Sequence, residues 1–182
     1  DNIGIGFMFA PNYHPAMKHV APVRKELKLR TIFNLLGPLT NPASAQNQIV
    51  GVYSKELTYV FAEVLKKLGS QHVLAVHGAD GMDEISITGK TYIAELKNGN
   101  INEYQFDPTE YGFNLGKIED IEVADIKGSK EMMLGILNGD KNTARDITIL
   151  NSGAALYVSG ICSDFESAFQ VSRKMLDEGH AL

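Results

Sequence analysis

The stretch Ile49 to His77, IVGVYSKELTYVFAEVLKKLGSQHVLAVH, decides the fold. Its first part, Ile49–Tyr53, is β-branched and bounded by turn residues, which predicts a strand. A helix is expected next, with Ser54 as its N-cap and Gly69 after its last turn. The apolar stripe of this helix consists of Leu57, Val60, Phe61, Val64, Leu65 and Leu68. Val73–His77 is a second buried strand, and such short connections predict a right-handed crossover between parallel strands.

Toward the C-terminus the pattern changes. Thr91–Phe106 alternates around Asn98-Gly99, which is the strongest short signal for a type I′ hairpin. The rest is helical, and the expected helices are Ser129–Asn138, Asn142–Ser159 and one from Ser163, with Ser163 and Glu166 as a capping box. We therefore expect an α/β fold, with a central, largely parallel sheet flanked by helices and an antiparallel hairpin portion.

Toward the N-terminus, Ile3–Phe9 has the composition of a buried strand. Ala16–Leu27 is expected to be a helix that Pro22 kinks or splits, and Thr31–Leu36 a short helix halted by Gly37-Pro38. Repeats, low-complexity tracts and flexible linkers are absent from the sequence, so residues 1–182 are expected to form a single domain.

Composition and charge exclude several classes of protein. The longest apolar run, Ile3–Pro11, is less than half of the roughly 20 residues that span a bilayer, and no signal peptide is visible. The single cysteine, Cys162, cannot form an internal disulfide. A net charge of −5 argues against nucleic-acid binding. We therefore expect a cytoplasmic protein that has neither a membrane nor a nucleic acid as its partner.

An acidic loop follows the second strand of the crossover. Asp80, Asp83 and Glu84 lie within five residues, after Val73–His77. Ligands of open α/β sheets bind at the carboxyl ends of the strands, and carboxylate oxygens suit Mg²⁺. Asp83-Glu84 is therefore a candidate metal pair, with a plain surface loop as the alternative.

A second group of candidate residues precedes residue 40. Arg24 offers bidentate recognition of a carboxylate, unless it is a solvated or salt-bridged helix residue. His14 is either a ligand contact or a helix-start residue, and Tyr13 and Met17 line a pocket or belong to the core. The turn Gly37-Pro38 would let the backbone approach a flat ligand closely. Residues 1–30 also carry five basic against two acidic residues, which suits a small anionic ligand or a solvated helix face.

Several strings of the sequence resemble the anthranilate phosphoribosyltransferase family. The most specific are His14–Lys18 (HPAMK), Pro22–Arg24 (PVR) and Arg30–Ala43 (RTIFNLLGPLTNPA). The match continues in the same order and covers essentially the whole chain, through His77-Gly78, Gly81–Ser86 (GMDEIS) and Asn151–Gly160. Ser152-Gly153 departs from the alanines expected there, a change that we expect to loosen helix packing.

The resemblance implies a fold, an activity and site residues. The fold would be of the nucleoside phosphorylase and phosphoribosyltransferase C-terminal type. The activity would transfer a 5-phosphoribosyl group from phosphoribosyl diphosphate to anthranilate, with Mg²⁺, in tryptophan biosynthesis, without a catalytic acid or base. Arg24 would contact the anthranilate carboxylate, while Asp83 and Glu84 bind Mg²⁺. The residues expected to line the anthranilate tunnel are Tyr13, His14, Met17 and Pro38.

The family's glycine-rich phosphate loop and helical N-terminal domain have no counterpart in the sequence and would lie upstream of Asp1. The resemblance therefore predicts a C-terminal α/β portion that is inactive alone and belongs to a homodimer formed through the N-terminal domain. Two alternatives share the fold: an enzyme like the pyrimidine nucleoside phosphorylases, and a non-catalytic homologue that binds nucleic acid.

Overall fold

The computed structural model of the protein describes residues 6, 8–15, 19, 22, 26 and 35–181. The chain divides into two compact units, residues 1–45 and 46–182. The expected strand Ile3–Phe9 and the expected helices Ala16–Leu27 and Thr31–Leu36 lie largely outside the described residues. The single domain over residues 1–182 stays a prediction.

Two short helices are described in the first unit: α1, Ala10–Tyr13, and α3, Leu36–Leu39. The prediction that Gly37-Pro38 halts a helix is wrong, because α3 contains both residues. Pro38 is tolerated there since the N–H groups of a helix's first turn have no partner within the helix.

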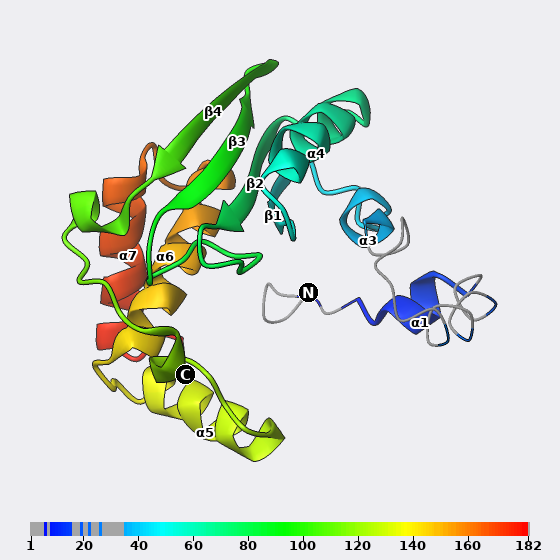
Figure 1. Ribbon diagram of the computed structural model, residues 1–182. Coiled ribbons are helices and arrows are strands. Elements are labelled where there is room, and N and C mark those ends of the chain that lie inside the picture. Colours follow the sequence, from blue (N-terminus) through cyan, green and yellow to red (C-terminus); the bar gives the residue numbers. More distant parts are fainter. Residues whose placement is uncertain are drawn as a thin grey trace. The chain divides into compact units, whose positions relative to one another are not determined.

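The second unit is built on a four-stranded sheet (Figure 1). Its strands are β1 (Asn47–Gly51), β2 (His72–Gly78), β3 (Thr91–Lys97) and β4 (Asn100–Phe106), in the order β1-β2-β3-β4. Helix α4, Glu56–Lys67, connects β1 to β2, and these two strands are parallel as predicted. The other two pairings are antiparallel, so the described sheet is mixed rather than largely parallel.

The β3–β4 hairpin turns at Asn98-Gly99, as predicted. Asn98 has a φ of 52° and Gly99 a φ of 77°. A type I′ turn needs positive φ at both central residues, which asparagine and glycine adopt at low cost. The turn sets the register of the hairpin, in which Lys97 lies opposite Asn100 and Thr91 opposite Phe106.

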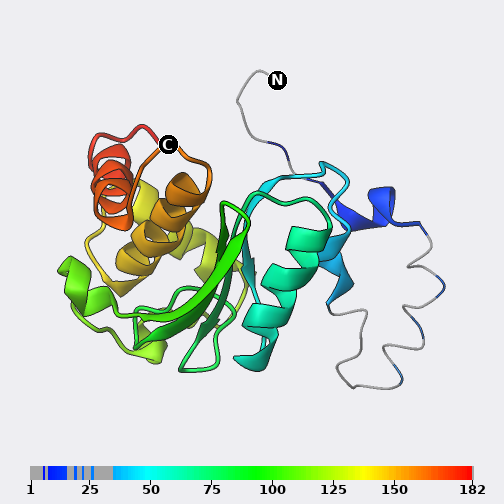
Figure 2. The same ribbon diagram turned by 90° about the horizontal axis from the view of Figure 1, so that it is seen from above.

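Helices cover both faces of the sheet (Figure 2). Helix α4 lies against one face, while α6 (Thr143–Val158) and α7 (Phe165–Asp177) lie on the other. Helix α5, Ile126–Leu137, precedes them, after two short 3₁₀ turns at Pro108–Tyr111 and Ile118–Asp120. The α/β fold class is thereby confirmed. Among the described residues, no helix has both the length and the apolar character needed to cross a bilayer.

Three predicted helix starts differ from the structure. Helix α4 is preceded by Lys55 instead of Ser54, and α5 starts at Ile126 because Asp125 caps it by accepting from the Gly128 N–H (2.8 Å). The capping box at Ser163 is also wrong: the Asp164 carboxylate accepts from the Ser167 N–H at 2.8 Å. An ionised carboxylate is the better acceptor at the positive end of a helix. The predicted bounds of α6 are confirmed, with Asn142 as its N-cap.

The core lies between the sheet and the α6–α7 layer. Its fully buried members include Leu74, Ile85, Ile87, Ile93, Ile149, Leu150 and Phe169. Gly153 of α6 faces Phe169 of α7 so closely that a Cβ at this position would lie 2.4 Å from the ring. The expectation that Ser152-Gly153 loosens the packing is therefore wrong for Gly153, because its missing side chain is the space that Phe169 fills. The lone Cys162 is buried.

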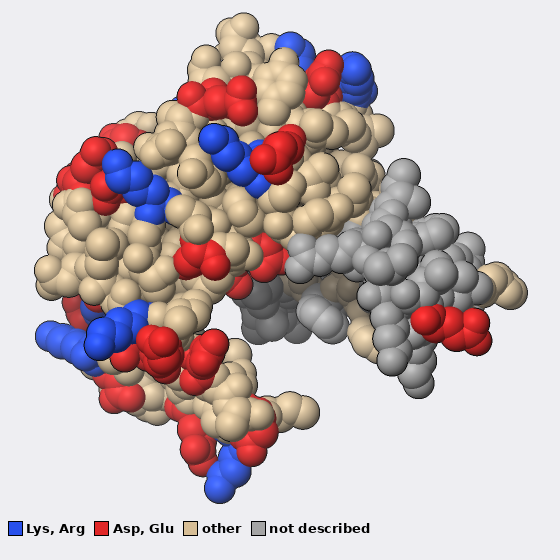
Figure 3. Space-filling model, in the orientation of Figure 1, with Lys and Arg blue, Asp and Glu red and all other residues tan. Residues whose placement is uncertain are grey.

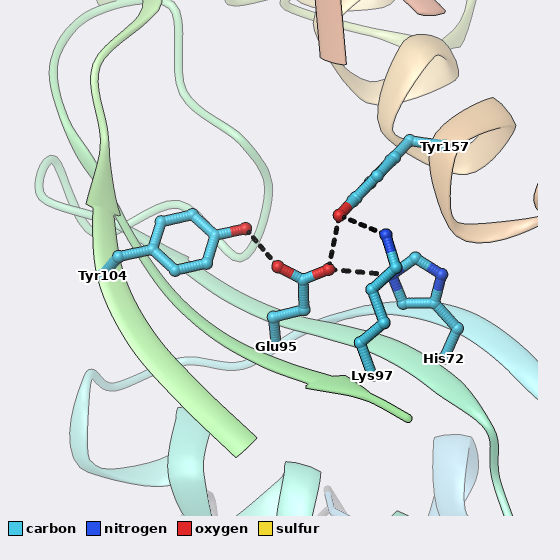
Figure 4. A network of polar contacts seen from close by, with 5 residues as sticks. All are labelled: His72, Glu95, Lys97, Tyr104 and Tyr157. Carbon is cyan, nitrogen blue, oxygen red and sulfur yellow. Dashed lines mark hydrogen bonds and ion pairs between the residues drawn. The ribbon is translucent and has the colours of Figure 1, made fainter. Parts of the chain in front are cut away.

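A polar network centred on Glu95 ties α6 to the sheet (Figure 4). The buried Glu95 carboxylate accepts hydrogen bonds from the hydroxyls of Tyr157 (2.7 Å) and Tyr104 (3.0 Å). His72 Nε2 lies 2.9 Å from the same carboxylate, and Lys97 donates to the Tyr157 hydroxyl at 2.9 Å. We call these five residues the Glu95 network. Three strands and one helix contribute to it.

Both tyrosine hydroxyls of the Glu95 network are held in the neutral form. Burial and the neighbouring Glu95 carboxylate raise the pKa of Tyr104 well above its usual range, and the pKa of Tyr157 rises for the same reasons. Because each hydroxyl must keep its proton to donate to Glu95, the network supplies the donors that a buried carboxylate requires.

Candidate functional site

The two parallel strands end at the same edge of the sheet. β1 ends at Gly51 and β2 at Gly78, and the loop 79–90 follows β2. A Cβ on Gly51 would lie 1.5 Å from the Asp83 carbonyl oxygen. Only glycine fits at this contact, so the end of β1 is the surface on which the Asp83 backbone rests.

Asp83 and Glu84 are both exposed at this edge. In the described part of the chain, neither carboxylate has a hydrogen-bond or ion-pair partner. No group of three or more metal-ligating side chains occurs among the described residues. The predicted pair is thus adjacent, accessible and without a partner among the residues that the structure describes.

Asp80 differs from its two acidic neighbours, although the sequence groups the three. Its Oδ2 accepts hydrogen bonds from the hydroxyls of Ser86 and Thr88, both at 2.5 Å. Its Oδ1 accepts from the Met82 N–H at 3.0 Å. Burial alone would raise the pKa of Asp80, but these hydrogen bonds outweigh it and the pKa is lowered. Asp80 is therefore an ionised residue that is engaged within its own loop.

Two further residues hold the loop, and sequence reasoning assigned a role to neither. The Asn151 side chain of α6 accepts from the Ile85 N–H at 3.0 Å and donates to the Ile85 carbonyl at 2.9 Å. His77 Nδ1 lies 2.8 Å from the Val52 carbonyl oxygen, which joins the end of β2 to the segment after β1. Asn151 carried a usable signal, because it is a polar residue beside Leu150 on an otherwise apolar helix face.

The first unit contains a pocket of about 490 Å³ that includes several residues expected to bind substrate. Its lining consists of Gly6, Met8, Tyr13, His14, Gly37, Asn41, Pro42 and Ala43. Tyr13, His14 and Gly37 are thus brought together, while Pro38 lies next to the lining, within α3. Arg24 and Met17 lie outside the described residues. A pocket lined by one phenol ring, one imidazole, the methionine Met8 and smaller residues has the chemistry to receive a planar aromatic ligand.

Charges are mixed over the protein surface. On the face shown in Figure 3, Lys and Arg side chains lie among Asp and Glu side chains. The described residues on that face form no continuous basic patch of the kind that nucleic-acid binding requires.

The family model described as "Glycosyl transferase family, a/b domain" matches residues 1–182, so the chain belongs to this family. The two relatives described next are both named anthranilate phosphoribosyltransferase, which confirms the resemblance found in the sequence. The relative from Methylobacillus flagellatus is 54% identical over 98% of this chain and 52% of its own length. That from Laribacter hongkongensis is 51% identical over 100% and 53%.

Solved structures give the same result. Anthranilate phosphoribosyltransferase from Thermus thermophilus superposes with a TM-score of 0.90 at 37% identity, over 99% of this chain and 53% of that one. The Saccharomyces cerevisiae enzyme in complex with 4-fluoroanthranilate gives 0.86 at 27% identity, over 97% and 51%. Its complex with PRPP and Mg gives 0.82 at 28% identity, over 92% and 49%. The chain spans about half the length of the curated relatives it matches.

Proposed function

We propose that the protein carrying this chain transfers the 5-phosphoribosyl group of phosphoribosyl diphosphate to the amine of anthranilate, in tryptophan biosynthesis. The observation that carries the proposal is the exposed Asp83-Glu84 pair at the carboxyl edge of the parallel strands, in a chain that matches its family along its whole length. The relatives above share the name of this activity, and one related structure holds PRPP and Mg. A cytoplasmic location and a homodimer belong to the same proposal.

Asp83 and Glu84 are proposed to hold Mg²⁺. The residues fit this ion, because Mg²⁺ typically takes one or two carboxylates and fills its remaining positions with water and substrate phosphates. Two adjacent, exposed carboxylates that have no partner within the described part of the chain offer that arrangement. When bound, Mg²⁺ would neutralise charge on the diphosphate leaving group. The protein's own contribution is to hold both carboxylates exposed at the edge of the sheet.

The acceptor contacts are proposed to come from the first unit. Tyr13, His14 and Gly37 line its pocket, and Met17 and Pro38 are proposed to complete the surface against the anthranilate ring. Arg24 is proposed to pair with the anthranilate carboxylate, because a guanidinium makes two parallel hydrogen bonds to a carboxylate.

No residue of this chain is assigned as a general acid or base. The aromatic amine of anthranilate is neutral near pH 7, so it needs no base to expose its lone pair. Catalysis would therefore depend on orientation of the amine and on stabilisation of the separating charge.

Arg24→Ala tests the acceptor assignment in the full-length protein. Losing a charge-assisted contact costs about 1.5–3 kcal/mol, which is roughly tenfold to a hundredfold in affinity. We expect the KM for anthranilate to rise by that factor, while the KM for phosphoribosyl diphosphate stays nearly constant. Steady-state kinetics with each substrate varied in turn measures both values, and an effect on the donor KM alone would remove Arg24 from the acceptor site.

A substrate comparison tests the activity itself. The full-length protein should turn over anthranilate with phosphoribosyl diphosphate, and should not turn over thymidine with phosphate. The opposite result would assign the protein to the phosphorylase chemistry that the sequence left as an alternative.

A further inference from the structure

The loop between β2 and β3 contains no helix or strand, yet its backbone is closely tied together. The Gly78 N–H donates to the Met82 carbonyl at 2.8 Å, and the Ala79 N–H donates to the Lys90 carbonyl at the same distance. These bonds close the loop at its base. A third backbone bond, from the Gly81 N–H to the Gly78 carbonyl at 2.9 Å, forms the first turn of the loop. The remaining hydrogen bonds of residues 80–86 within the described part of the chain involve side chains.

Asp80 accepts three of the side-chain hydrogen bonds of the loop. Its carboxylate joins the Met82 N–H, the Ser86 hydroxyl and the Thr88 hydroxyl, so one side chain bridges three points of the loop. Ser86 is completely buried, and its backbone N–H donates to the Thr91 hydroxyl at 2.9 Å. A Cβ on Gly78 would lie 2.4 Å from Asp80 Oδ1, which shows that the carboxylate folds back over the end of β2.

Asp83 and Glu84 lie between fixed points. On one side, Met82 is bonded to Asp80 and to Gly78. On the other side, Ile85 is held by both polar atoms of the Asn151 amide. Only the two exposed carboxylates between these points have no protein partner among the described residues.

We infer that Asp80 is a positioning residue for the Asp83-Glu84 pair and not a third metal ligand. Through the Ser86 and Thr88 hydroxyls and the Met82 N–H, it sets the direction in which the two neighbouring carboxylates point. The inference rests on the proposed function, because it takes Asp83 and Glu84 as the ligands of Mg²⁺. Groups that orient metal ligands typically change metal affinity by about 10- to 100-fold when they are removed.

The test compares two ways of breaking the same contacts in the full-length protein. Asp80→Asn alters the acceptor, and the double variant Ser86→Ala/Thr88→Val removes the donors while leaving the Asp80 carboxylate in place. Binding of Mn²⁺ in the presence of inorganic diphosphate is measured by electron paramagnetic resonance. Hydrogen–deuterium exchange of residues 80–90 is measured by mass spectrometry. Ser163→Ala is the matched control, because it removes a similar serine–carboxylate hydrogen bond (2.7 Å to Asp164) on another element.

We expect Asp80→Asn and the double variant each to weaken Mn²⁺ binding by about 10- to 100-fold. Each should also speed exchange at residues 82–86, and the triple variant should be no worse than Asp80→Asn alone, because both changes break one set of contacts. Ser163→Ala should alter neither measurement. If Asp80 were a metal ligand, the double variant would keep its Mn²⁺ affinity while Asp80→Asn lost it, and that result would overturn the inference. Unchanged exchange and affinity in both variants would overturn it as well.

Failure of the proposed function gives a different pattern. If Asp83→Asn/Glu84→Gln leaves Mn²⁺ binding unchanged, the metal assignment fails, and the exchange data still decide whether Asp80 holds the loop. Should the double variant not fold, Thr88→Val alone removes one donor at a partly exposed position. This variant should produce a smaller change in the same direction, and no change at all would contradict the inference.

Discussion

Strand β2 has a carboxylate-centred cluster at each end, and the two clusters are built differently. At its start, His72 belongs to the Glu95 network, whose donors come from positions up to 62 residues away along the chain. At its end, Asp80 takes its donors from the next eight residues. The Glu95 network contains no exposed carboxylate, whereas the contacts of Asp80 are followed by Asp83 and Glu84, which have no partner among the residues described. Hydrogen bonds from distant parts of the chain to the buried Glu95 carboxylate join a helix to the sheet. Hydrogen bonds from nearby residues to Asp80 fix the shape of a loop, and this loop exposes other side chains.

Helix α6 contributes side-chain contacts at both ends of β2. Asn151 holds the Ile85 backbone near the Asp80 loop, and Tyr157 donates to Glu95. Gly153 lies between them, against Phe169. The two clusters therefore differ in chemistry, but both are in contact with α6. The following predictions separate their effects.

The largest effect should follow from Asp83→Asn/Glu84→Gln, which changes only the exposed carboxylates. Loss of metal binding should cost about 3 kcal/mol or more of transition-state stabilisation, so turnover in the full-length protein should fall at least about 100-fold. Because both side chains are exposed, the melting temperature should hardly change. Excess Mg²⁺ should restore part of the activity. If the melting temperature instead fell along with the activity, the pair would belong to a structural network, as Glu95 does.

Glu95→Ala should produce the opposite pattern. The change leaves the hydroxyls of Tyr104 and Tyr157 without their acceptor, and each unsatisfied buried group costs about 1–3 kcal/mol. We expect the free energy of unfolding to fall by about 3 kcal/mol, as measured by urea denaturation. Mn²⁺ binding by the remaining folded protein should be unchanged. A stability close to that of the unaltered protein would mean that water replaces the carboxylate without cost.

Gly153→Ala should affect both ends of β2 through α6. The new methyl group would meet the Phe169 ring, and overpacking of this kind costs about 1–3 kcal/mol. Thermal unfolding should show this loss, while exchange at the Ile85 amide should increase because Asn151 moves with the helix. Ser152→Ala, at an exposed position on the same helix, is the matched control. Equal stability of the two variants would show that the Phe169 side chain can change its conformation at little cost.

The smallest effect is on the pH dependence of stability, and its direction differs between the two ends of β2. The raised pKa values of Tyr104 and Tyr157 give stability that is present below pH 10 and is lost as the pH rises above it. The lowered pKa of Asp80 gives stability that is present above about pH 4 and is lost as the pH falls. Tyr104→Phe should therefore flatten only the alkaline limb of a melting-temperature profile, and Asp80→Asn only the acid limb. If Tyr104→Phe changed the acid limb, or Asp80→Asn the alkaline limb, the pH dependence would not come from these two groups.

Local sequence patterns predicted the parts of the fold that are local. The β1–α4–β2 crossover, the Asn98-Gly99 turn and the bounds of α6 follow from spacing and turn chemistry within short windows. The helix start at Asp164 was missed because serine and aspartate stand side by side, and either can cap.

The candidate site was only partly predictable for a related reason. The position of Asp83-Glu84 after a strand indicates its edge of the sheet, but the composition of the loop does not distinguish Asp80 from its neighbours. That distinction depends on where the hydroxyls of Ser86 and Thr88 point. The Glu95 network joins four separate segments, so no periodicity could reveal it. The role of Gly153 depends equally on a distant residue, Phe169.

The reach of the Glu95 network has a consequence for the order of folding. The strands of the meander β2–β3–β4 are neighbours along the chain, and contacts between such neighbours form fastest. Tyr157 belongs to α6 and can reach Glu95 only when this helix docks. The carboxylate is therefore placed in the sheet before its donor at the shortest distance, the Tyr157 hydroxyl, is present. Docking of α6 should then be the slower step. Because the chain has no tryptophan, the ultraviolet signal of its tyrosines would follow the docking of α6 directly. Replacing Tyr157 would remove part of this signal.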